Sequence, residues 1–274
     1  MNKKDPYIDL WNKICSILQS KLPEWKKKIA DGGQVSAVEA RERGDEFSDN
    51  QIFHGIVKAV LSNSTDWSRI EKVLPELNDL FHDFDLEYYS GLSANDIERD
   101  FLPWFSERGA GSLTMKQNLK SLIKTAQILK DCSQRIGSLN RYLTSLLELN
   151  KNDTIALVQQ LGSYKSLHKL PALGIPIAAE AMKNVGFDVA KPDRHINRAM
   201  GSFKLVHFSK WPDRSKCKAP QITETEMIDV MQSMDRFAKH VGVRVSFMDN
   251  AIWLLCCSCK SGLYLSNAQL SGLV

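Results

Sequence analysis

Apolar residues recur along this chain with the spacing of an α-helix, and this periodicity constrains the fold more than any other feature. Three stripes with intervals of three and four residues run through 52–61, 119–129 and 228–237. Such intervals place apolar side chains on one helix face, whereas a half-buried strand alternates polar and apolar residues. Only a short stretch at 241–247 is ambiguous, so we predict an all-α fold.

Capping residues and glycine-containing breaks divide the chain into helices of ordinary length. Side-chain oxygens at a helix start accept the unpaired N–H groups of the first turn. Four predicted N-caps are Asn50, Asp66, Ser93 and Thr223. Thr223 is the best of them, because Glu226 lies three residues later and completes a capping box. Breaks are expected at 31–33, 107–111 and 210–213.

The 274 residues suit one large domain or two closely packed lobes. Hydrophobic residues make up 43% and charged residues 25%, as in ordinary soluble globular proteins. No apolar run approaches the ~20 residues that span a bilayer. Residues 1–22 are interrupted by charges and lack the apolar core of a signal peptide. We therefore expect a cytoplasmic protein without a membrane partner.

Cysteine spacing bears on metal binding. The six cysteines are Cys15, Cys132, Cys217, Cys256, Cys257 and Cys259. Without a secretory signal, a disulfide framework is not expected. The cluster at 256–259 raises the alternative of a metal site, but thiolate zinc sites use a Cys-x2-Cys pair and a second pair further on. Small buried side chains are the favoured interpretation, and we predict no metal and no other cofactor.

Positive charge is concentrated in one segment. Residues 161–220 hold eleven Lys or Arg and four Asp or Glu, a net charge of +7, whereas the whole chain carries +4. One-sided positive charge is typical of proteins that bind a polyanion, although a solvated basic face is a common alternative.

A proline- and glycine-containing turn lies inside this basic segment, at 170–179. A helix ending near Lys169 is predicted to run into the turn, and a second helix to start at Pro176, where a missing N–H costs nothing. Gly186 is predicted to end that helix in the left-handed conformation. Such a hairpin presents backbone N–H groups that bind a phosphate without reading sequence. A plain helical turn is the alternative.

An extended approach follows the second helix, because Pro192 restricts the residue before it. Asp193 then stands at the start of another helix, among basic residues that include Lys191 and Arg194. Its simplest role is an N-cap.

The order of these parts resembles the helix-hairpin-helix-GPD superfamily of DNA base-excision glycosylases. The family pattern is Leu-Pro-Gly-Val-Gly-x-x-x-Ala, a helix, then Val-Asp-x-His-Ile-x-Arg. The hairpin matches are Leu170, Pro171, Gly174 and Ala178, and the later matches are Asp193, His195, Ile196 and Arg198. Residues 53–66 resemble the first barrel helix and polar loop of endonuclease III-like members, and 249–255 resemble the last helix.

This chain departs from the family pattern at three points. Pro176 occupies the position of the lysine that bifunctional members use, and proline cannot form a Schiff base. A displaced lysine, Lys169 or Lys183, is the alternative. Ala172 replaces the first hairpin glycine, and the four-cysteine iron–sulfur loop that ends many members is absent.

The resemblance implies a role for each candidate site residue. Asp193 would be the catalytic carboxylate. The implied DNA contacts are Leu173, Gly174, Ile175, Ile177, Asn63, Ser64, Lys191 and Arg194. Asn63, with Ser64, would fill the gap left by the flipped base. Trp104 and Trp67 are weaker candidates for the base pocket.

The implied architecture is a two-lobed helical DNA glycosylase fold with a helix-hairpin-helix motif. One lobe comprises 51–186, and the other comprises 1–50 plus 187–274 and carries Asp193. The expected protein is a nucleoid-associated monomer that binds double-stranded DNA containing a damaged base, with an alkylated base favoured. It would act as a monofunctional N-glycosylase. The alternatives are a bifunctional glycosylase/lyase and a non-catalytic helix-hairpin-helix DNA-binding protein.

Overall fold

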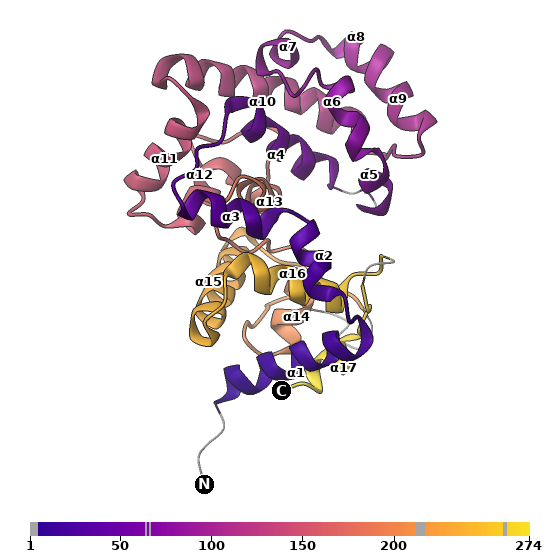
Figure 1. Cartoon of the computed structure of the whole chain (residues 1–274), viewed down its shortest axis with the longest axis vertical. Helices are drawn as coiled ribbons and strands as arrows, with labels where there is room; N and C mark the ends of the chain where they lie inside the picture. Colours follow the sequence, from indigo (N-terminus) through magenta and orange to yellow (C-terminus); the bar gives the residue numbers. More distant parts are fainter. Residues whose placement is uncertain (1–4, 64, 66, 212–216, 260–261) are drawn as a thin grey trace. The chain divides into compact units, whose positions relative to one another are not determined.

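The computed structural model describes residues 5–63, 65, 67–211, 217–259 and 262–274 (Figure 1). Across these residues the regular secondary structure is helical, apart from one isolated antiparallel bridge between Lys210 and Gln221. The all-α prediction is confirmed, and the ambiguous stretch at 241–247 is a junction between two helices. No described helix is both long enough and apolar enough to cross a membrane.

The chain forms two compact units. The terminal unit comprises Met1–Ala40 and Gly186–Val274, and the central unit comprises Arg41–Val185. The observed boundaries fall at 40/41 and 185/186, whereas the sequence places the lobe limits at 50/51 and 186/187.

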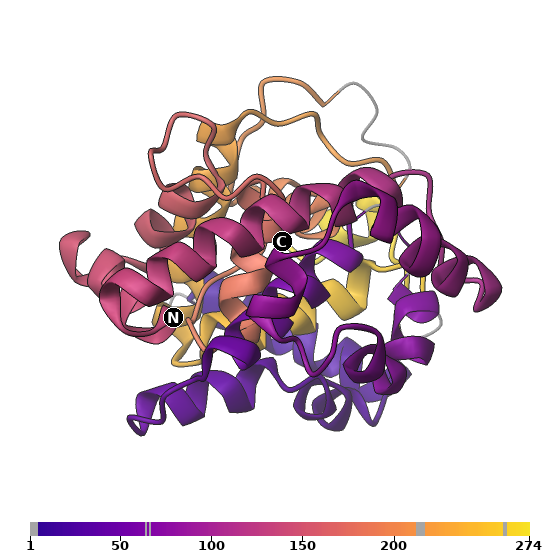
Figure 2. The same cartoon turned by 90° about the horizontal axis from the view of Figure 1, so that it is seen from above.

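Short helices dominate the first half of the central unit, and longer ones the second half (Figure 1). Its helices are α4 (Asp49–Leu61), α5 (Trp67–Val73), the 3-10 helix η1 (Leu74–Glu76), α6 (Leu77–Leu80), α7 (Leu86–Ser90), α8 (Ala94–Asp96), the π-helix η2 (Ile97–Phe101), α9 (Leu102–Glu107), α10 (Met115–Ile136), α11 (Leu139–Leu149), α12 (Thr154–Gly162) and α13 (Ile175–Asn184). With 22 residues, α10 is the longest described helix, and it packs against α4 and α7 (Figure 2).

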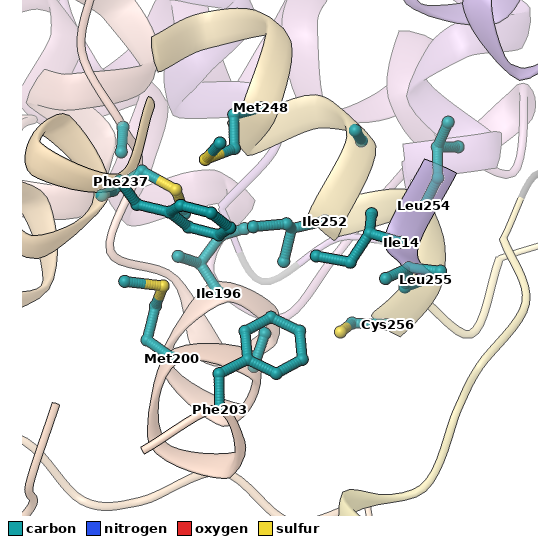
Figure 3. Close-up of a cluster of buried hydrophobic side chains, with 14 of the residues drawn as sticks. Ile14, Ile196, Met200, Phe203, Phe237, Met248, Ile252, Leu254, Leu255 and Cys256 are labelled. Carbon is teal, nitrogen blue, oxygen red and sulfur yellow. The ribbon is translucent and has the colours of Figure 1, made fainter. Parts of the chain in front are cut away.

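The terminal unit combines both ends of the chain. Its helices are α1 (Pro6–Lys21), α2 (Trp25–Asp31), α3 (Gln34–Glu42), which contains the unit boundary, α14 (Arg194–Ser202), α15 (Glu224–Val241), α16 (Val245–Cys256) and α17 (Asn267–Ser271). Helix α16 packs against α1, α2, α14 and α15. Figure 3 shows its Met248 and Ile252 among buried side chains that include Met200 and Phe237. This apolar core holds α14 and α16 together.

Close packing of α13 on α4 and α12 organises the central unit. A Cβ on Gly55 in α4 would lie 2.6 Å from a Val185 side-chain carbon, and one on Gly162 in α12 would lie 2.9 Å from the Cα of Ile175. The Asn184 side chain also donates to the Gly55 carbonyl at 2.9 Å. Glycine therefore lets the backbones approach on both sides of α13.

The predicted helix starts are confirmed in part. Ser93 and Thr223 are N-caps with capping boxes. The prediction for Asn50 is wrong, because α4 begins earlier: Ser48 is the N-cap and Gln51 completes its box. Asp66 lies outside the described residues.

Replacing Gly162 tests the close approach of α12 and α13. Gly162→Ala should lower the free energy of unfolding by about 1–3 kcal/mol, because overpacking against a backbone atom cannot be relieved by a rotamer change. The control Gly91→Ala, whose Cβ would be no nearer than 3.5 Å to any neighbour, should change it by less than about 1 kcal/mol. Urea denaturation followed by circular dichroism measures both, and equal losses would contradict the packing argument.

Candidate functional site

The hairpin of the central unit connects α12 to α13. Helix α12 ends at Gly162, so the prediction of a helix reaching Lys169 is wrong. Residues 163–174 form turns instead, and the Leu170 N–H donates to the Leu161 carbonyl at 3.0 Å. The loop thus folds back on the end of α12 and delivers the chain to the start of α13.

The start of α13 leaves backbone donors available. Gly174 is the N-cap and, having no side chain, provides no capping acceptor. The N–H groups of Gly174, Ile175 and Ile177 donate no hydrogen bond within the described part of the chain. Gly174 is exposed and Ile177 half-buried, whereas Leu173 and Ile175 are buried. A ligand would therefore meet the backbone of this turn, and unpaired N–H groups at a helix N-terminus suit an anion.

Three hydrogen bonds, made by the side chains of Lys169 and Thr125, hold the hairpin in shape. The Lys169 ammonium donates to the carbonyl of Leu170 at 2.6 Å and also to that of Leu173. The Ala172 N–H donates to the Thr125 hydroxyl of α10 at 3.1 Å. Ala172 is not among the residues with positive φ, so alanine in place of the family's glycine creates no backbone strain.

The sequence prediction for the end of α13 is confirmed, and the predicted start is wrong by one residue. Pro176 occupies the first turn, one position later than predicted, since Ile175 is the first helical residue. Gly186 follows the C-cap residue Val185 with a φ of 86°, the left-handed conformation expected there.

Asp193 begins α14 in the terminal unit. Its backbone is extended, and Oδ1 accepts the N–H groups of His195 at 2.7 Å and Ile196 at 3.0 Å. The N-cap role is therefore confirmed. No described residue donates a hydrogen bond to Oδ2, and the side chain is only half-buried. One carboxylate oxygen thus caps the helix, and the other accepts no hydrogen bond from the described residues.

His195 and Arg194 follow Asp193 on α14, Lys191 precedes it on the linker, and Trp253 of α16 packs against His195. The His195 ring meets the half-buried Trp253 ring edge-to-face, with centroids 6.2 Å apart. Burial lowers the pKa of His195 and outweighs the opposite effect of Asp193. Burial therefore favours the neutral form of the imidazole. Arg194 is exposed, with its Nε 3.3 Å from the His195 ring nitrogen, and Lys191 is half-buried. The sequence did not single out Trp253, whose position beside α14 depends on helix packing.

Two of the basic residues counted in 161–220 do not contribute to a charged surface. Arg198 is 1% exposed and donates to the carbonyls of Cys217, at 3.2 Å, and Leu265. Lys183 is 2% exposed and pairs with Glu180 at 3.2 Å. Arg198 instead ties the C-terminal segment to α14.

The loop after α4 and the α9–α10 connection border a surface hollow of about 760 Å³ in the central unit. Its lining includes Thr65, Phe105 and the fully exposed Leu113. Asn63, in the loop after α4, is half-buried, and Ser64 lies outside the described residues.

Neither candidate pocket tryptophan lines the hollow. Trp67 is half-buried at the start of α5. The Arg108 guanidinium lies 4.2 Å from the ring centroid of Trp104. The assignment of both to a base pocket stays a prediction.

The cysteine cluster lies at the end of α16. Cys256 and Cys257 are buried, as small core side chains are, and Cys259 is partly exposed. Burial raises the pKa of the Cys256 thiol to about 12. Among the described residues, no group of three His, Cys, Asp or Glu side chains is arranged to hold a metal ion.

Two solved structures match the fold along nearly its whole length. The crystal structure of Methanocaldococcus jannaschii 8-oxoguanine DNA glycosylase is 14% identical, with a TM-score of 0.58 over 93% of this chain and 98% of that one. The crystal structure of the 8-oxoguanine glycosylase/lyase of the same organism, in complex with a 15mer DNA containing 8-oxoguanine, is 15% identical, with a TM-score of 0.55 over 88% and 94%. No family model and no curated protein sequence matches this chain. The chain therefore has a helical DNA glycosylase fold, as the sequence predicted.

Lys169→Met tests whether the ammonium group holds the hairpin. Leaving the Leu170 and Leu173 carbonyls without their charged donor should lower the free energy of unfolding by about 1–3 kcal/mol. Lys165→Met, at an exposed position in the same loop, should have little effect. Urea denaturation compares the two variants, and similar stabilities would show that the Lys169 contacts do not support the turn.

Proposed function

We propose that this protein is a DNA glycosylase that hydrolyses the N-glycosidic bond of a damaged base flipped out of duplex DNA, leaving an abasic site. The observation that carries the proposal is Asp193, which caps α14 with Oδ1 and keeps Oδ2 unbound by the described residues. The whole-length fold match to two 8-oxoguanine glycosylases supports it.

DNA would be held mainly through its backbone. The unpaired N–H groups at 174–177 fit a phosphate oxygen, and the side chains of Lys191 and Arg194 would add charge that attracts phosphates. Extracting a base from the stack costs a few kcal/mol. Asn63, with its neighbour Ser64, would offset part of that cost by filling the vacated space.

Asp193 would act on the sugar of the flipped nucleotide. As the bond between C1′ and the base nitrogen breaks, its electron pair leaves with the base and positive charge develops on the sugar. A carboxylate oxygen facing C1′ stabilises that charge and helps to remove a proton from the attacking water. The water oxygen bonds to C1′, and the proton that the water loses passes by way of the carboxylate to the departing base, or to solvent when a cationic base leaves neutral.

Three residues support a reaction in which the base is removed but the strand is not cut: Pro176 and the two displaced lysine candidates. Pro176 has no amine where bifunctional relatives carry lysine. Of the two displaced candidates, Lys183 is buried in an ion pair with Glu180. The other, Lys169, donates to hairpin carbonyls. One structural neighbour is named a glycosylase/lyase, so the bifunctional alternative is the one to test.

The favoured substrate is an electron-poor alkylated base, which would stack on an aromatic face such as Trp67 or Trp104. The principal alternative is 8-oxoguanine, the lesion named for both structural neighbours. A panel of duplexes with one lesion each, assayed for abasic-site formation, distinguishes them.

Asp193→Asn tests the catalytic role directly. Asparagine caps helices about as well as aspartate, so the variant should fold normally. Loss of the charge should lower the single-turnover excision rate on the order of a thousandfold. Affinity for damaged duplex should be retained or increase, because a negative charge near phosphates is removed. Excision within a few-fold of the parent would leave Asp193 as a cap only.

Strand cleavage tests the monofunctional assignment. Because Pro176 cannot form a Schiff base, the abasic product should remain intact until it is treated with hot alkali. Borohydride added during the reaction should trap no covalent protein–DNA adduct. A trapped adduct that disappears in Lys183→Met or Lys169→Met would instead identify a displaced lysine nucleophile.

A further inference from the structure

The segment from Gly186 to Asp193 has no regular secondary structure, yet side chains of the terminal unit hold it at several points. The first is Asp188, whose two carboxylate oxygens accept the N–H groups of Val245 at 3.0 Å and Ser246 at 2.7 Å. Arg244 at the N-cap of α16 provides no side-chain cap. Asp188 therefore supplies the missing cap and fixes the beginning of the segment to α16.

The second tether lies two residues before Asp193. Asp249, on the first turns of α16 and 2% exposed, accepts the Lys191 N–H through Oδ1 at 3.0 Å. This N–H sits just before Pro192, which can donate no backbone hydrogen bond itself.

The third tether comes from α14. The Asn197 side chain, 4% exposed, donates to the Pro192 carbonyl at 3.1 Å. Its backbone N–H also donates to the Asp193 carbonyl at 2.8 Å, as the first helical bond. Asn197 thus hydrogen-bonds to the carbonyls of Pro192 and Asp193, and Asp249 accepts a hydrogen bond from the Lys191 N–H.

We propose that Asp249 and Asn197 are positioning residues that set the direction of the Asp193 carboxylate through the backbone of Lys191 and Pro192. This inference rests on the proposed glycosylase function. The apolar core already joins α14 to α16, through side chains such as Met200 and Ile252. The two polar tethers act instead on the short linker, where a small rotation would move Asp193 Oδ2. Misplacing a reacting group by about 1 Å can cost on the order of a hundredfold in rate.

The test compares the excision rates of variants that remove the hydrogen bond of Asp249 or Asn197 to the linker with that of a variant that keeps the Asp249 hydrogen bond. Asp249→Ala and Asn197→Ala should each lower the single-turnover excision rate by about 30–100-fold. Asp249→Asn keeps a side-chain oxygen for the Lys191 N–H and should lose no more than about threefold. The matched control is Ser202→Ala, because the Ser202 hydroxyl is also buried on α14 and has no partner within the described residues. It should match the parent.

A binding measurement separates positioning from general damage. Duplexes would carry either a cationic pyrrolidine or a neutral tetrahydrofuran in place of the abasic sugar. A correctly aimed carboxylate prefers the cation, so the parent should bind the pyrrolidine duplex more tightly. Asp249→Ala and Asn197→Ala should narrow that preference without weakening binding to undamaged duplex. An unchanged preference for the pyrrolidine duplex would overturn the proposal. So would equal excision rates for Asp249→Asn and Asp249→Ala, because the negative charge of Asp249, and not its hydrogen bond to Lys191, would then set the rate.

Hydrogen exchange at the Lys191 amide tests the hydrogen bond to Asp249 independently of any glycosylase activity. The amide should exchange faster in Asp249→Ala than in the parent or in Asp249→Asn. Unchanged exchange would show that the tether does not hold the segment, whatever the activity. A parent protein that excises no lesion and prefers neither analogue would overturn the proposed function. The hydrogen bonds to the linker could still be detected by exchange, but they would then have no role in catalysis.

Discussion

The cap that Asp193 makes on α14 is the interaction on which the proposed site depends. One of its oxygens satisfies two backbone N–H groups at the start of α14, so the side chain cannot rotate freely. No described residue donates a hydrogen bond to the second oxygen. A carboxylate that caps a helix is thereby held in one orientation, and the catalytic role proposed for Asp193 would use that preorganisation.

Helix α16 holds the linker that leads to Asp193. Its apolar face packs in the core of the terminal unit, so its position is fixed by burial (Figure 3). Its polar atoms then fix the linker: its first N–H groups hold Asp188, and Asp249 holds the Lys191 amide. Buried hydrogen bonds of this kind are costly to leave half-made, so the linker has few alternative conformations. The hydrophobic core thus fixes α16, and α16 in turn fixes the linker that positions the half-buried Asp193.

In the central unit, α13 begins without a side-chain cap. Gly174 provides no cap, so the first N–H groups of α13 have no partner among the described residues, and the Lys169 ammonium stabilises the carbonyls of the turn. Gly162 lets α12 approach the start of α13 closely. Proline in the first turn of α13 removes a donor that would have had no intrahelical partner and removes any nucleophilic amine at that position.

The sequence alone determined the features that depend on neighbours along the chain. Helical periodicity gave the all-α class, the Thr223 capping box gave a helix start, and Gly186 gave a helix end, because each is a local backbone effect. The order of hairpin and Asp193 indicated the fold. Tertiary structure decided the rest. It buried Lys183 and Arg198, ended α12 at Gly162 and brought Asp249 to Lys191, residues 58 positions apart. Those outcomes depend on how packed helices place distant side chains, and no local pattern encodes that placement.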